Sequence, residues 1–137
     1  MPATLTPFIA LAAGGLVCGV AAILFILLRP AATGSAALAG ALAAGFAAFS
    51  AVTVATEGLA PVVLNHTGNL WGVQVWWDLL FALGVAYFLI LPRARAQGMN
   101  LPLWTVFILA TASIGLLAMA ARLFWLERAG QGAAAQA

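Results

Sequence analysis

Four long stretches of this chain carry very little charge, and they limit what it can fold into. They cover residues 7–28, 36–57, 71–91 and 102–126. Each is close to the ~20 residues that a helix needs to cross the ~30 Å hydrocarbon core of a bilayer. Because backbone groups in lipid must bond within their own segment, each stretch is expected to be helical. The sequence therefore predicts an all-α polytopic integral membrane protein, a single domain built as a bundle of four transmembrane helices.

Composition favours the same class, because only 6% of the residues are charged and 66% are hydrophobic. Soluble domains carry ~25% charged residues. The basic residues are five scattered arginines, which is not the clustered pattern of a nucleic-acid interface. Cys18 is the lone cysteine and His66 the lone histidine, so we expect no disulfide, no metal site and no cofactor. The expected partners are the lipid bilayer and a hydrophobic small molecule, without nucleic acid.

Small residues predict close helix packing. Gly15 and Gly19 form a GxxxG step in the first stretch, and residues 36–57 are rich in alanine and glycine. Such faces let another helix approach closely, so a homo- or hetero-oligomer is expected. Residues 1–6 lack the basic side chain of a signal peptide, which favours a retained first helix. The tail, residues 128–137, is expected to be flexible.

A polar stripe ends the second stretch, where Ser50, Thr53 and Glu57 share one helical face. One interpretation is hydroxyl bonding to helix carbonyls, with Glu57 at the water interface. The other is a polar face directed into the bundle. The connection that follows, residues 58–69, contains His66, which we interpret as a capping or solvated residue, with proton transfer as the alternative.

Asp78 lies inside the third stretch, where a charge costs at least ~2.5 kcal/mol and should face protein or water. Gln74 precedes it by one helical turn on the same face. Four crossings would place the start of the third stretch and the end of the fourth on one membrane side, together with Glu57. The candidate constellation gathered there comprises Glu57, His66, Trp71, Gln74, Trp77, Asp78, Arg122 and Trp125.

Two interpretations of Asp78 remain open. In the first, Asp78 and Arg122 form an ion pair that neutralises both charges and fixes helix register. In the second, Asp78 and Glu57 are two carboxyl groups in different environments, one of which donates a proton during catalysis. Tryptophan rings around such a site would stabilise a cation formed from the substrate.

Arginine bias predicts the orientation of the chain. With four crossings, Arg29, Arg93 and Arg95 fall on one side, whereas Arg122 and Arg128 fall on the other. The majority side is expected to be cytoplasmic. Both termini are then expected to be periplasmic, in a bacterial inner membrane.

Five segments, WWDLLFA, RARAQGM, a following tryptophan, ATASIGLLA and LFWLER, resemble a family of small bacterial membrane proteins of unknown function. That family is similar to the integral-membrane terpene cyclases and the small lycopene cyclase subunits. The resemblance covers Glu57 to Arg128 and implies a helical membrane fold. It also implies that Glu57 and Asp78 correspond to the acidic residues of the cyclases.

Two functions follow as hypotheses. The first is an accessory or structural membrane protein that binds a partner subunit or a lipid-like ligand, such as an isoprenoid, a quinone or a carotenoid. The alternative is a membrane-embedded terpene or carotenoid cyclase that uses Glu57 and Asp78 for acid catalysis.

Overall fold

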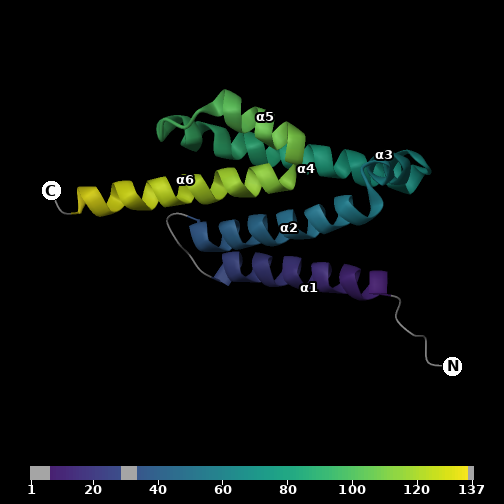
Figure 1. Cartoon of the computed structure of the whole chain (residues 1–137). Coiled ribbons are helices and arrows are strands. Elements are labelled where there is room, and N and C mark those ends of the chain that lie inside the picture. Colours follow the sequence, from purple (N-terminus) through teal and green to yellow (C-terminus); the bar gives the residue numbers. More distant parts are fainter. Residues whose placement is uncertain (1–6, 29–33, 136–137) are drawn as a thin grey trace. The chain divides into compact units, whose positions relative to one another are not determined.

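The computed structural model describes residues 7–28 and 34–135, and the chain divides into two units, up to Gly34 and from Ser35 onward (Figure 1). The first unit contains one helix, α1 (Pro7–Leu28), which matches the prediction and buries none of its own residues. Every regular element in the described ranges is an α-helix, so the all-α class is confirmed.

The second unit contains the other helices, and polar side chains cap three of them. These helices are α2 (Ala36–Glu57), α3 (Ala60–Thr67), α4 (Leu70–Ala96), α5 (Leu101–Thr111) and α6 (Ser113–Ala134). The side chains of Ser35, Asn69 and Asn100 accept backbone N–H bonds in the first turns of α2, α4 and α5. Such caps satisfy donors that a helix start would otherwise leave unpaired, and they locate these starts.

α2 and α6 pack against each other and run in opposite directions (Figure 1). Small side chains make this contact close. Ala39 and Ala43 of α2 are buried, and a Cβ built on Gly40 would lie 3.9 Å from the Cβ of Ala121. The alanine- and glycine-rich second stretch therefore packs against a helix of its own unit, as its composition predicts.

The core of the second unit lies between α4, α5 and α6. Met119 and Leu123, one turn apart on α6, are completely buried, and Ile108 of α5 is nearly so. Ile90 and Ala94 of α4 complete the cluster. The core therefore lies at the C-terminal end of α4, and the first turns of α4 lie outside it.

α4 continues past Pro92, where the sequence predicts its end. Proline inside a helix removes one backbone bond and normally terminates or kinks the helix. Here tertiary contacts hold the last turn, because Ala94 is fully buried and Arg93 makes a two-point ion pair with Glu127 of α6. The guanidinium nitrogen and carboxylate oxygen of that pair approach to 2.6 Å.

The predicted fourth helix is two helices, because the chain reverses direction at Ala112 (Figure 1). Ala112 has a φ of +50°, which ends α5 and starts α6. The turn brings α6 against α5 at Gly115, where an added Cβ would lie 2.9 Å from the Cα of Ile108. Only glycine permits this approach, and the close packing holds the strained backbone of Ala112.

Residues 58–69 also differ from the prediction, because they contain α3 and are not a plain connection. Pro61 stands in the first turn of α3, where its missing N–H costs nothing. Among the described residues, α1, α2 and α4 are long and apolar enough to cross a membrane. The fourth predicted crossing is not confirmed, since α5 has only 11 residues.

Candidate functional site

The first four turns of α4 carry an open hollow of about 380 Å³ that contains Asp78. Asp78 and Gln74 provide its polar groups, and the remainder of the lining is apolar. We call this surface the α4 hollow, lined by Trp71, Gln74, Val75, Trp77, Asp78 and Phe81. All these residues belong to one helix, so no other described element from Ser35 onward lines the hollow. The structure thereby brings together Trp71, Gln74 and Asp78, as their helical spacing predicts, and Trp77 also lines the hollow.

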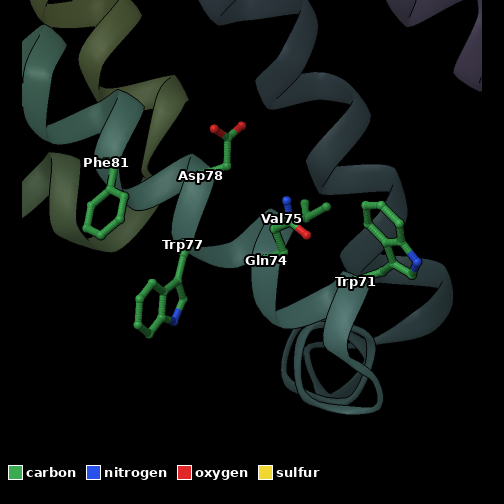
Figure 2. A pocket seen from close by; sticks show the side chains of 6 residues that line it. All are labelled: Trp71, Gln74, Val75, Trp77, Asp78 and Phe81. Carbon is green, nitrogen blue, oxygen red and sulfur yellow. The ribbon is translucent and has the colours of Figure 1, made fainter.

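Trp77 and Phe81 extend to one side of α4, and the carboxylate of Asp78 extends to the other (Figure 2). Trp77 and Phe81 contact each other edge to face, with 5.9 Å between ring centroids. Asp78 points away from both rings and is exposed. The arrangement therefore does not enclose the carboxylate among tryptophans, which the catalytic interpretation of Asp78 requires.

Arg122 lies far from Asp78, and the predicted ion pair is absent from the described residues. α4 and α6 run in the same direction (Figure 1), with Arg93 paired to Glu127. Asp78 precedes Arg93 by 15 residues and Arg122 precedes Glu127 by 5, which leaves an offset of 10 residues. At 1.5 Å per residue the offset is about 15 Å.

Arg122 instead stacks on Trp125, with its guanidinium carbon 4.6 Å from the ring centroid. Both residues lie on the half of α6 that pairs with the end of α4, so they do not join the α4 hollow. The prediction of one layer containing Arg122, Trp125 and Asp78 was wrong for a physical reason. It assumed that residues 102–126 cross the membrane once, whereas the chain turns back at Ala112.

A second cavity, of about 280 Å³, lies between α2 and α3 and contains Glu57. We call it the α2–α3 pocket. Its polar lining comes from Ser50, Thr53, Glu57, Asn65 and His66, and its apolar lining comes from Phe46, Phe49, Val54, Gly58, Pro61 and Val62. The polar stripe of the second predicted helix therefore lines a cavity. Thr53 also donates to the carbonyl of Phe49 at 2.9 Å, which matches the first interpretation of the stripe for this residue.

His66 is held in the last turn of α3 by two contacts. Its Nδ1 bonds to the backbone carbonyl of Val62, and its ring lies 5.1 Å from the ring of Trp76 on α4. A carbonyl oxygen can only accept, so Nδ1 carries the hydrogen.

Glu57 and Asp78 line separate cavities, so the two candidate carboxylates do not share a site in the described ranges. No group of three or more His, Cys, Asp or Glu side chains in these ranges could hold a metal ion. Phe46 and Asn65 belong to the α2–α3 pocket, although the sequence predicts no role for them. The sequence contains a signal for Phe46: it precedes Ser50 by one helical turn, so it lies on the same face of α2 as the polar stripe.

Comparison of the chain with protein-family models, with curated proteins and with solved structures gave no match.

Proposed function

We propose that this chain is an integral membrane protein that holds a lipid-like ligand against α4 without transforming it. Three helices suited to crossing a bilayer support the first part. Large apolar side chains remain exposed along α1, with Phe8 at 70% and Leu28 at 75% exposure. A water-soluble protein does not leave such faces uncovered, whereas lipid covers them at no cost.

α5 and α6 form a re-entrant hairpin in this arrangement. With 11 residues, α5 is about 16 Å long, which is about half the thickness of the ~30 Å hydrocarbon core of a bilayer. α6 then returns toward the end of α4. Arg93, Arg95 and Arg128 then lie at the same side, opposite Glu57. The arginine bias becomes one-sided, which favours a cytoplasmic location for that side and for residue 135.

The observation that carries the ligand proposal is the uncovered carboxylate of Asp78. It lies about 12 Å into α4, counting eight residues from Leu70, and no element from Ser35 onward covers it. A charge at such depth needs a polar partner. A ligand with a polar head for Asp78 and Gln74, and an apolar body that passes around α4 to Trp77 and Phe81, would cover the whole α4 hollow.

Purification in mild detergent, followed by mass spectrometry of bound small molecules, tests this proposal. We expect a lipid-like molecule to co-purify with the wild-type protein. Phe81→Ala should weaken its binding at least about tenfold, because burying an aromatic ring contributes roughly 1.5–3 kcal/mol. Phe88→Ala is the matched control, since Phe88 lies on α4 outside the α4 hollow and is similarly exposed, 74% against 65%.

Equal binding by the two variants would contradict a ligand in the α4 hollow. If the wild-type protein co-purifies with another membrane protein and with no small molecule, the ligand proposal is overturned and the chain is an accessory subunit.

A cyclase is the weaker proposal. It needs Glu57 and Asp78 to act on one substrate, and they line separate cavities. Conversion of an added isoprenoid by the wild-type protein, abolished by Asp78→Asn, would overturn the non-catalytic function.

A further inference from the structure

We propose that the α2–α3 pocket binds a small hydrophobic ammonium compound, with Glu57 as the counter-ion. The pocket is separate from the α4 hollow, and the inference does not depend on what covers Asp78. Polar groups from two helices converge on it: Ser50, Thr53 and Glu57 from α2, and Asn65 and His66 from α3. It is therefore a cavity between elements and not a groove along one helix.

The polar groups of the pocket are rich in free acceptors. Glu57 makes no ion pair within the described ranges, so both carboxylate oxygens can accept. Thr53 uses its hydrogen on the carbonyl of Phe49, which leaves oxygen lone pairs. The Nδ1–H of His66 is used on the carbonyl of Val62, so only Nε2 of this ring is left to meet a ligand. A ligand that satisfies these groups must donate hydrogen bonds, and an ammonium head provides up to three of them.

Charge favours a cation over an anion. No arginine of the described residues lines the pocket, since these arginines are at the far end of α4 or on the second half of α6. Glu57 and Asp78 both belong to the end of the unit that α3 occupies. An anionic head would meet the carboxylate of Glu57 without a compensating cation, whereas an ammonium would form a charge-assisted hydrogen bond with it.

The apolar lining determines the rest of the ligand. Phe46 and Phe49 precede Glu57 on α2 by 11 and 8 residues, about 16 and 12 Å along the helix axis, so their rings contact the apolar body of the ligand and not its ammonium head. Pro61 and Val62 of α3 add aliphatic surface. The volume of about 280 Å³ is near the lower limit of typical ligand cavities, so the fitting compound is small, about one aromatic ring with a short chain.

Equilibrium dialysis of the purified full chain in mild detergent tests this inference with three probes of similar size. These are 2-phenylethylammonium, 2-phenylethanol and 3-phenylpropanoate. We expect saturable binding of the ammonium compound at least about tenfold tighter than that of the alcohol, because a hydrogen bond to a charged group contributes roughly 1.5–3 kcal/mol. The carboxylate should not bind. Equal binding of all three probes, or tighter binding of the carboxylate, would overturn the inference without any mutation.

The Glu57→Gln variant tests whether the ammonium compound binds in the α2–α3 pocket. It keeps the shape of the side chain and removes its charge, so ammonium binding should fall at least about tenfold while alcohol binding stays the same. Thermal unfolding of the variant is measured in parallel to establish that it is folded. Loss of ammonium binding in Asp78→Asn but not in Glu57→Gln would place the cation in the α4 hollow and overturn the inference. The ammonium measurement does not depend on whether a lipid-like ligand co-purifies with the protein. The proposal for the α4 hollow and the proposal for the α2–α3 pocket can therefore fail independently.

Discussion

Leu123→Ala is expected to lower the free energy of unfolding in mild detergent by about 2–5 kcal/mol, the range for a buried leucine. Leu123 is completely buried on α6, next to Met119 and the end of α4. Most of this loss comes from packing, because the cavity removes dispersion contacts that detergent cannot replace. A lower midpoint of thermal unfolding would report it.

Leu109→Ala is the matched control for that experiment. Leu109 lies on α5 and is 78% exposed, so the same truncation there should change stability by less than about 0.5 kcal/mol. Equal effects of the two variants would mean that α4, α5 and α6 do not form the packed core described above.

Gly72→Ala is expected to separate α3 from α4. A Cβ on Gly72 would overlap the backbone oxygen of Asn65 and lie 3.2 Å from the Cα of His66. Backbone atoms cannot yield as a flexible side chain can, so α3 must move. We expect a loss of about 1–3 kcal/mol in unfolding free energy, as for an overpacked core. Ammonium binding should fall as well, because Asn65 and His66 line the α2–α3 pocket.

Gly84→Ala on the same helix controls for the intrinsic effect of the substitution. Apart from the adjoining backbone of α4 itself, no described atom lies within 4 Å of a Cβ built on Gly84. Alanine favours helix over glycine by about 1 kcal/mol, so Gly84→Ala should be neutral or stabilising. The two variants should thus differ in the sign of their effect, and a Gly72→Ala protein as stable as the Gly84→Ala protein would contradict the α3–α4 contact.

The first two helices were predictable to the residue. α1 and α2 are long apolar runs bounded by Pro7 at the start and by Ser35 and Gly58 around α2. Length and composition decide such helices, because a chain in lipid has no alternative partner for its backbone groups. The spacing of Gln74 and Asp78 also placed them correctly, since it depends only on the helical repeat.

Long-range features were not predictable in the same way. The segment around Ala112 contains no proline, and the glycine that permits the reversal, Gly115, acts through a contact with Ile108. Pro92 resembles a helix end, yet burial of Ala94 and the Arg93–Glu127 pair extend α4 past it. Tertiary contacts overrode the local preference at both places.

The expected Asp78–Arg122 pair was lost as a consequence of the reversal at Ala112. A single unrecognised turn directs α6 back toward the end of α4, and so carries Arg122 away from Asp78. The pairing of charges therefore depended on topology, whereas the grouping of Trp71, Gln74, Trp77 and Asp78 depended on one helix alone.

Cysteine accessibility in membrane vesicles of known orientation tests the re-entrant arrangement most directly. In a Cys18→Ala background, single cysteines are placed by Asn65→Cys, Gln97→Cys and Ala135→Cys, at exposed positions that leave every arginine in place. With the α5–α6 hairpin, the cysteines at positions 97 and 135 should label from one side of the membrane and the cysteine at position 65 from the other. Labelling of position 135 from the same side as position 65 would contradict the hairpin and restore four crossings.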